Sequence, residues 1–203
     1  LITVKQKGKK EQDLMIEPGY TDYRQLYNRW VEQRAQMVKE LSGGRVGYVH
    51  VEGMDSESFR RVYSELLGKY RTCEAVIVDT RHNGGCWLHD DLATLLDGKG
   101  YIRFEPRGQY IGTEPYNKWT KPSCVLIGED NYSDACGFPY VYKPLGIGKL
   151  IGAPVPGTMT AVWWENQIDP SIVFGIPQVG ATGVKEGRYL ENMQIEPDIL
   201  VYN

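Results

Sequence analysis

The 203-residue sequence has few residues of the kinds that bind metal ions, with only three histidines and four cysteines. The cysteines show neither a C-x-x-C pair nor the histidine spacing of a zinc site. No run of hydrophobic residues is long enough to span a membrane. We therefore expect no metal site and no membrane span, and we expect most of the cysteines to act as small hydrophobic residues.

The sequence also lacks a strong charge of either sign. Its formal net charge is −3, and no dense cluster of lysine and arginine lies beyond residues 5–10, so nothing indicates a nucleic-acid partner. Hydrophobic residues make up 41% of the chain and charged residues 24%, which places it among ordinary globular proteins. The length suits one domain, or one domain and a fragment of another.

The chain begins with leucine, and no signal peptide follows. We therefore expect a fragment of a longer protein, with upstream domains of the same chain among its partners. For the compartment, a periplasmic or exported location in a bacterium is favoured over the cytoplasm.

Residues 1–20 differ in pattern from the rest. Short apolar runs at residues 1–4 and 13–16, closed by a Pro-Gly pair, predict a hairpin left from a preceding small β domain. Apolar residues then recur at helical spacing up to residue 41, where a Gly-Gly pair ends the helix, and Thr21 or Asp22 can cap its start. We therefore divide the chain into residues 1–20 and a main domain of residues 21–203.

Strands and helices alternate through the main domain. The predicted strands are residues 45–51, 73–80, 101–104, 123–127, 149–152, 161–165, 172–175 and 199–201. The predicted helices are residues 55–70, capped by Asp55 or Ser56, residues 88–96, and a helix after residue 133; a loop covers residues 105–121. The run at 73–80 is nearly all apolar, which is typical of a strand covered on both faces. This alternation predicts an α/β fold with a mainly parallel central sheet flanked by helices.

The most informative segment brings a serine to a sharp turn. A short apolar strand, residues 123–127, leads through what we call the serine turn (residues 128–133) to Ser133 and a helical segment. A serine hydroxyl is a poor nucleophile in water, so a fold that uses one must expose it, direct backbone N–H groups at its target and supply a base. Taken alone, Ser133 would be a helix N-cap, which is the usual role of serine before a helix.

A second segment fits the need for backbone donors. The strand of residues 73–80 runs into Asn83, Gly84 and Gly85, residue types that tolerate positive φ and let N–H groups point outward together. We call residues 83–86 the glycine turn. Asn-Gly-Gly is also a common turn without function, but its pairing with the serine turn after the next strand of the sheet favours an oxyanion site.

These segments, in this order, resemble a known family. The matching segments are residues 47–51, Asp79-Thr-Arg-His-Asn-Gly-Gly85, Asn131-Tyr-Ser-Asp134, residues 145–152, and Glu191-Asn before residues 195–199. They resemble the catalytic domain of the tricorn-type proteases and, more distantly, the carboxyl-terminal processing peptidases. The resemblance covers residues 21–202. It implies a crotonase-like ββα fold, a PDZ-like origin for residues 1–20, and serine endopeptidase or oligopeptide-processing activity on peptides or unfolded polypeptides. We expect this activity to need no metal and no organic cofactor.

The resemblance also implies roles for single residues. Ser133 is the nucleophile, and the backbone N–H of Asp134 forms half of the oxyanion hole, with Gly85 or Cys86 giving the other half. Glu191 supports the base histidine through a second serine, as in the tricorn branch. The processing-peptidase branch has a lysine base after the nucleophile, where this chain has none. We therefore expect Ser-His-Glu rather than Ser-Lys chemistry.

The base histidine is the missing part. In the tricorn branch it comes from a helical subdomain before the small β domain, so we expect it upstream of residue 1, and the fragment alone to be inactive. His50, His82 and His89 do not match the family's base, although His82 or His89 could line the cleft. Glu105 resembles the acidic S1 residue of the tricorn branch and could select lysine or arginine at P1, although a loop carboxylate is more often only solvated.

Two other interpretations stay open. The crotonase-like fold also serves acyl-CoA enzymes, which would use the oxyanion N–H groups without a committed serine. A degenerate peptidase domain could instead be a catalytically incomplete peptide-binding or scaffold module. A homo-oligomer is compatible with each of these interpretations.

Overall fold

The computed structural model describes residues 1–17, 19 and 22–202. It divides into two compact units, residues 1–33 and residues 34–203, which are described separately. The first unit holds an antiparallel hairpin of β1 (Ile2–Val4) and β2 (Gln12–Leu14). The predicted hairpin is therefore confirmed, with shorter strands. The assignment of residues 1–20 to a PDZ-like domain, and of residues 21–203 to one catalytic domain, stays a prediction.

Helix α1 (Tyr23–Ser42) begins in the first unit and ends in the second. The side chain of Asp22 accepts a hydrogen bond of 2.9 Å from a backbone N–H of the first turn, so Asp22 caps the helix. Thr21, the other predicted cap, lies outside the described residues. At the other end Gly44, with φ of 80°, donates its N–H to the carbonyl of Lys39 at 2.8 Å, which is the predicted glycine C-cap.

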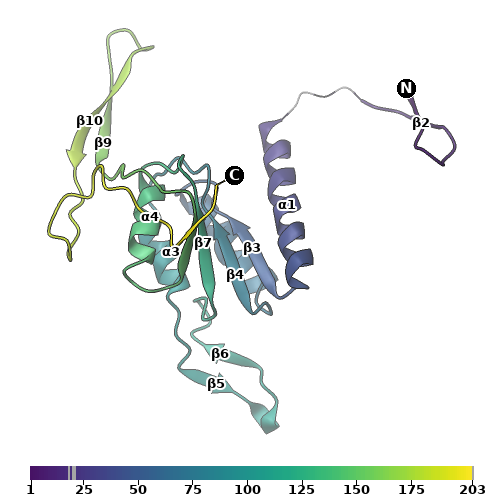
Figure 1. The fold of residues 1–203 in the computed structure, drawn as a ribbon, viewed down its shortest axis with the longest axis horizontal. Helices are drawn as coiled ribbons and strands as arrows, with labels where there is room; N and C mark the ends of the chain where they lie inside the picture. Colours follow the sequence, from purple (N-terminus) through teal and green to yellow (C-terminus); the bar gives the residue numbers. More distant parts are fainter. Residues whose placement is uncertain (18, 20–21, 203) are drawn as a thin grey trace. The chain divides into compact units, whose positions relative to one another are not determined.

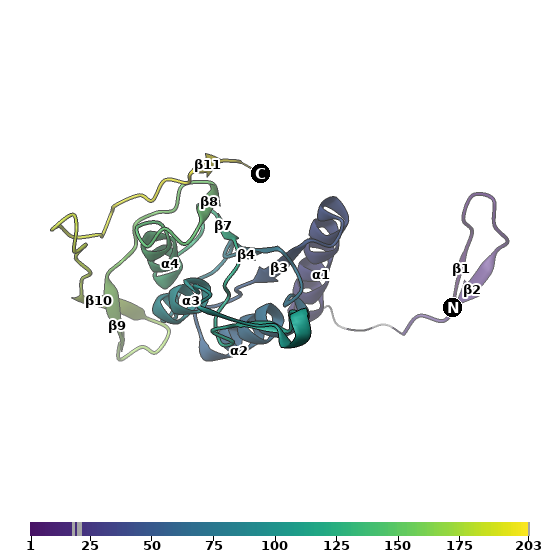
Figure 2. The ribbon, with the colours of Figure 1, turned by 90° about the horizontal axis from the view of Figure 1, so that it is seen from below.

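The second unit is built on a parallel sheet of five strands in the order β11-β8-β7-β4-β3 (Figures 1 and 2). Its strands are β3 (Val46–His50), β4 (Ala75–Asp79), β7 (Ser123–Ile127), β8 (Lys149–Gly152) and β11 (Ile199–Leu200). The mainly parallel central sheet is confirmed. Because β4 and β7 are parallel neighbours, with Val78 opposite Val125, their carboxyl ends adjoin at one edge of the sheet.

Three helices lie along one face of this sheet (Figure 2): α2 (Ser56–Ser64), α3 (His89–Leu96) and α4 (Asp134–Tyr142). Helix α2 continues as a π-helical turn, η1 (Glu65–Lys69), so the helix expected at residues 55–70 changes pitch near its end. Asp55, rather than Ser56, is its cap, because the Asp55 carboxylate accepts a hydrogen bond of 2.8 Å from the N–H of Ser58.

Alternate strand residues face the helical layer. Val78 of β4 and Val125 of β7 are fully buried, and they belong to the same core cluster as Leu92, Leu95, Ala135 and Phe138. Ile77 and Leu126, on the opposite face, are only half-buried. The second face of β4 is therefore less completely covered than its apolar sequence indicates.

Two antiparallel hairpins project from the sheet and its helices (Figure 1). They are β5–β6 (Ile102–Phe104 with Gly112–Glu114) and β9–β10 (Ala161–Asn166 with Val173–Val179). Strand β6 was missed in the expected loop of residues 105–121, because Gly-Thr-Glu carries no apolar alternation. Strand β10 runs further than predicted, through Pro177, which an edge strand can accommodate.

Candidate active site

The glycine turn and the serine turn meet at the carboxyl edge of the sheet. A Cβ atom built on Gly85 would lie 2.6 Å from Ser133 Cβ, 2.7 Å from Tyr132 O and 3.0 Å from Asp134 N. The N–H of Tyr132 also donates to the carbonyl of Asn83 at 3.1 Å. The structure therefore brings together three of the predicted site residues, Ser133, Asp134 and Gly85, with Ser133 half-buried rather than inside the core.

Backbone strain gathers at the same place. Ser133 has φ of 53°, Cys86 126°, His82 66° and Asn192 60°, in the left-handed region that side chains other than glycine rarely adopt. Three of these four residues lie in or beside the two turns, and the fourth follows Glu191; a fifth such residue, Arg107 with φ of 53°, lies between β5 and β6. Such conformations cost of order 1–3 kcal/mol each and cluster at functional sites.

Two buried asparagines hold the turns in shape. The side chain of Asn83 donates to the carbonyl of Val51 at 2.8 Å and accepts the N–H of Gly85 at 2.8 Å. The side chain of Asn131 donates to Thr80 Oγ1 and to the carbonyl of Ala135, and it accepts the N–H of Gly128. Both amide side chains have hydrogen-bond partners inside the protein. Asn83 thereby fixes the backbone of the glycine turn, and Asn131 fixes the backbone around Ser133.

The Asp-x-Arg part of the glycine-turn motif has a structural role. Asp79, fully buried, accepts the hydroxyl of Tyr48 at 2.7 Å and the guanidinium of Arg81 at 2.7 and 2.9 Å. Burial, and then the charge of Asp79, raise the pKa of Tyr48. The pair anchors the end of β4 just before the glycine turn begins.

The available backbone donors differ between Gly85 and Cys86. The N–H of Gly85 is occupied by the side chain of Asn83. In the described part of the chain, the N–H groups of Cys86 and Asp134 have no intramolecular hydrogen-bond partner. An unpartnered N–H at each turn is what an oxyanion hole requires.

A loop joins the serine turn to Glu191. The N–H of Ser133 donates to Thr158 Oγ1 at 2.9 Å. The next two N–H groups, of Met159 and Thr160, both donate to Oε2 of Glu191 at 2.7 Å. Half-buried Glu191 is thus held one loop away from Ser133, and within the described residues no hydrogen bond reaches its Oε1.

The first side chain of α4 contacts the first turn of α3. Asp134, 8% exposed, accepts hydrogen bonds from the backbone N–H groups of Leu88 and His89 and from Nδ1 of His89. The hydrogen bond to Asp134 raises the pKa of His89. His89 therefore lies beside Asp134, directly after the serine turn, and its expected place in a cleft stays a prediction.

The other two histidines are held elsewhere. His50, on β3, has Nε2 at 2.9 Å from the carbonyl of Arg81, and burial lowers its pKa. His82 pairs through Nδ1 with Asp130. Neither of these partners is Ser133.

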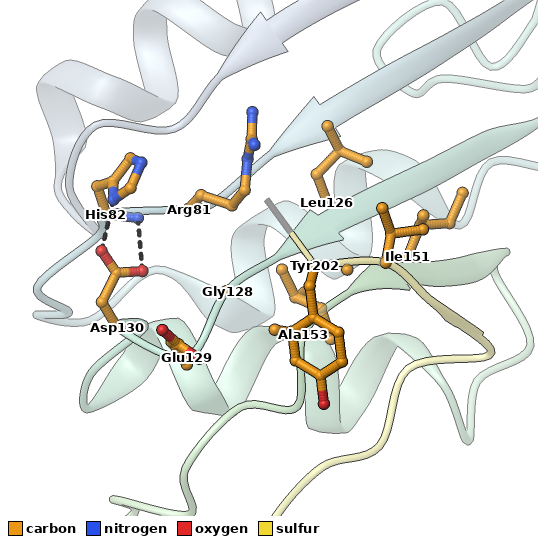
Figure 3. Close-up of a pocket in the computed structure, with 12 residues that line it drawn as sticks. Arg81, His82, Leu126, Gly128, Glu129, Asp130, Ile151, Ala153 and Tyr202 are labelled. Atoms are coloured by element: carbon orange, nitrogen blue, oxygen red, sulfur yellow. Dashed lines mark hydrogen bonds and ion pairs between the residues drawn. The ribbon is translucent and has the colours of Figure 1, made fainter.

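A cavity of about 350 Å³ lies at the carboxyl ends of β7 and β8, beside the two turns (Figure 3). The paired side chains of His82 and Asp130 stand at one side of it, and Tyr202 at another (Figure 3). Ser133 does not line this cavity. Across the described residues, no group of three or more His, Cys, Asp or Glu side chains could hold a metal ion, and no helix is long and apolar enough to cross a membrane.

Glu105 is not brought to the serine turn. It follows β5 in an exposed position and forms an ion pair with Arg103. The segment that follows its hairpin contacts the end of α3, where the N–H of Trp119 donates to the carbonyl of Leu95 at 2.8 Å. His89, at the start of α3, contacts Asp134. The proposed S1 role of Glu105 stays a prediction.

Residues 45–201 match peptidase family S41. The chain belongs to this family. The tricorn protease of Thermoplasma acidophilum is 27% identical over 198 residues, which are 98% of this chain and 18% of that protein. A tricorn protease homolog of Saccharolobus solfataricus is 28% identical over 178 residues, covering 87% of this chain and 16% of the homolog.

The crystal structure of the tricorn protease is similar to this S41 chain, with a TM-score of 0.83 at 26% identity, over 98% of this chain and 20% of that one. The comparisons confirm the tricorn-type resemblance and the crotonase-like α/β fold. The S41 chain spans about a fifth of the length of these relatives.

Sequence reasoning missed several residues that shape this S41 site. The carboxylate of Asp134, the hydroxyl of Thr158 and the amide of Asn131 each fix the serine turn. Asn131 and Asp134 stand in a segment that carries the family resemblance, but the contacts of their side chains were not predicted. Thr158 lies in a loop without periodicity, so its contact depends on the tertiary fold alone.

Proposed function

We propose that this S41 domain is the catalytic domain of a serine endopeptidase or oligopeptide-processing enzyme that acts through a serine acyl-enzyme. The observation that supports this most strongly is the contact of the two turns. A Cβ atom built on Gly85 would lie 2.6 Å from Ser133 Cβ, and among the described residues the backbone N–H groups of Cys86 and Asp134 have no intramolecular hydrogen-bond partner.

The chemistry follows from that geometry. Ser133 Oγ attacks the carbonyl carbon of the scissile peptide bond, and its proton passes to a histidine base. The carbonyl oxygen becomes an oxyanion that accepts hydrogen bonds from the N–H groups of Asp134 and Cys86, each worth about 3 kcal/mol in the transition state. The C–N bond then breaks, the base returns its proton to the amine that leaves, and water hydrolyses the acyl ester. No cofactor takes part.

The histidine base, in this proposal, comes from a segment upstream of residue 1. The contacts of the imidazoles in residues 1–203 support this, because His50, His82 and His89 are held by Arg81, Asp130 and Asp134. Oε1 of Glu191 is oriented by the two N–H bonds to Oε2 and is open to a serine hydroxyl that steadies the base. Residues 1–203 alone would then be inactive.

Peptide or unfolded polypeptide is the substrate class that fits. The segment that binds Glu191 continues directly into edge strand β9, and an extended peptide can pair with such an edge. The P1 preference proposed for Glu105 is tested with peptides that vary only at P1. A preference for lysine or arginine that Glu105→Gln abolishes supports it, and equal cleavage of all P1 residues rejects it.

A catalytically incomplete peptide-binding module is the alternative, favoured by the same observation that the imidazoles have other partners. A fluorophosphonate probe on the full-length protein separates the two. Labelling that Ser133→Ala abolishes and Ser171→Ala leaves unchanged supports the enzyme, because Ser171 is an exposed hairpin serine bonded to Asp169. Labelling that survives Ser133→Ala, or no labelling of the wild type, rejects Ser133 as the nucleophile.

A further inference from the structure

The carboxylate of Asp134 is almost enclosed, and all of its hydrogen bonds come from the start of α3. The backbone N–H groups of Leu88 and His89 donate to Oδ2, the second at 2.9 Å, and His89 Nδ1 contacts Oδ1. A carboxylate only accepts hydrogen bonds, so His89 carries a proton on Nδ1. Three donors from one turn hold this side chain in one orientation.

The orientation of Asp134 matters because its backbone N–H is a proposed oxyanion donor. The side chain and the N–H belong to one residue, so a carboxylate that is locked against α3 also fixes the direction of the N–H beside Ser133. An oxyanion donor must be directed at the oxygen before the reaction begins.

Trp87 and Gly137 border the half-buried ring of His89. Its ring is flanked by Trp87 in an edge-on contact with centroids 5.5 Å apart. A Cβ atom at Gly137 would lie 3.2 Å from Asp134 Oδ1 and 3.7 Å from His89 Cγ. A larger residue at position 137 would therefore push against the pair from helix α4.

We propose that His89 is a positioning residue for catalysis, which acts through Asp134 to hold the oxyanion N–H and the serine turn in their reactive geometry. This inference rests on the proposed function. It assigns His89 the role of a hydrogen-bond donor and not that of the general base. The hydrogen-bond donor at Nδ1, rather than a titratable ring, is what the site needs.

A pair of substitutions of equal size tests this in the full-length protein. His89→Asn places an amide N–H donor where Nδ1 lies, and His89→Leu has a similar shape without a donor. Loss of one oxyanion donor lowers rates by about 100- to 1,000-fold, and we expect a misdirected donor to cost less. His89→Leu should lower the rate of fluorophosphonate labelling, and kcat, by about 10- to 100-fold with little change in KM.

His89→Asn should restore labelling to within a few-fold of the wild type, and Thr94→Ala, on an exposed position of the same helix, should have no effect. Wild-type labelling by the Leu variant overturns the inference. So does an Asn variant as slow as the Leu variant, which would indicate a titrating role for the ring. Both results leave Ser133-dependent labelling, and with it the proposed function, intact.

Asp134→Ser gives a second test if the Leu variant does not fold, because serine suits a helix start and keeps the backbone N–H. It should slow labelling as much as His89→Leu, and the double variant should be no slower than either single one. Wild-type labelling by Asp134→Ser, or additive losses, overturns the inference. Labelling that persists in Ser133→Ala rejects the proposed function and this inference together.

Discussion

The backbone N–H of Ser133 donates to the side-chain hydroxyl of Thr158 at 2.9 Å, across 25 residues of sequence. The same hydroxyl lies 3.2 Å from Cys136 Sγ in the first turn of α4. One threonine thus ties the serine turn to the loop that also binds Glu191. The strained φ of Ser133 is maintained by contacts of this kind rather than by its own preference.

Thr158→Val should therefore slow acylation and weaken the fold. Valine keeps the shape of threonine but leaves the Ser133 N–H without its acceptor, which costs about 1–3 kcal/mol for a buried group. We expect a lower free energy of unfolding by that amount in urea titrations, together with slower fluorophosphonate labelling. Thr94→Val, exposed on α3, is the control, and equal effects of the two substitutions would contradict the role of Thr158.

Gly85 and its neighbour Gly84 offer a matched pair of alanine substitutions. A Cβ at Gly85 would meet Ser133 Cβ at 2.6 Å, and φ of 92° adds strain, whereas a Cβ at Gly84 would meet nothing within 4 Å. Gly85→Ala should separate the two turns and lower Ser133 labelling by at least tenfold, as roughly expected for a displaced oxyanion donor. Gly84→Ala should have a much smaller effect, and similar losses for both would argue against close contact of the turns.

Cys86→Gly should keep activity and stabilise the protein. Cys86 has φ of 126°, which glycine adopts without the cost of a Cβ, and the backbone N–H donor is unchanged. The gain in the free energy of unfolding should be at most about 1 kcal/mol, since glycine also loses more chain entropy on folding. A large loss of kcat with an intact fold would indicate that the thiol itself takes part.

The sequence predicts the two turns because each combines an apolar strand with residues that favour a turn. Strand β7 occupies residues 123–127 as expected, since its apolar run is bounded by Pro122 and Gly128. The parallel sheet then places both turns at one edge. Fold class and the approach of Ser133 to Gly85 therefore follow from local patterns and one topological rule.

The contacts that refine the site could not be predicted this way. Asp134 meets His89 only because the starts of α3 and α4 converge, and these residues are 45 positions apart in sequence. Thr158 reaches Ser133 from a loop without periodicity. The pattern around Asp134 and His89 is that of two ordinary helix starts, with an acidic residue in the first turn, so nothing marked the pair.

The Asp134–His89 pair should make stability depend on pH. The hydrogen bond from His89 to Asp134 raises the pKa of His89 in the folded state. Its contribution is therefore fully present below the pKa of an unfolded histidine and is lost as pH rises through the folded value. Asp134→Asn should destabilise the protein more at about pH 5.5 than at about pH 9, on either side of the usual histidine range.

Urea titrations at the two pH values measure this difference. Asp90 and Asp91, on the same helix, also raise the pKa of His89, after Asp134 in size. Asp91→Asn should therefore show the same trend more weakly. A destabilisation by Asp134→Asn that grows as pH rises has the opposite sign and would exclude this linkage.

Glu191→Gln should lower turnover while leaving the fold intact. Glutamine can still accept the N–H groups of Met159 and Thr160 through its carbonyl oxygen, so the loop that carries Thr158 keeps its support. The charge that would stabilise a protonated histidine base is lost, however. The analogous loss in serine proteases costs up to about 10⁴-fold in kcat, and we expect at least a tenfold decrease here. Glu196→Gln, at an exposed glutamate whose carboxylate accepts a hydrogen bond from the nearby Gln194 side chain, should leave kcat unchanged. Full turnover by the Glu191 variant would mean that its carboxylate serves the loop alone, and the base would then need another source of support.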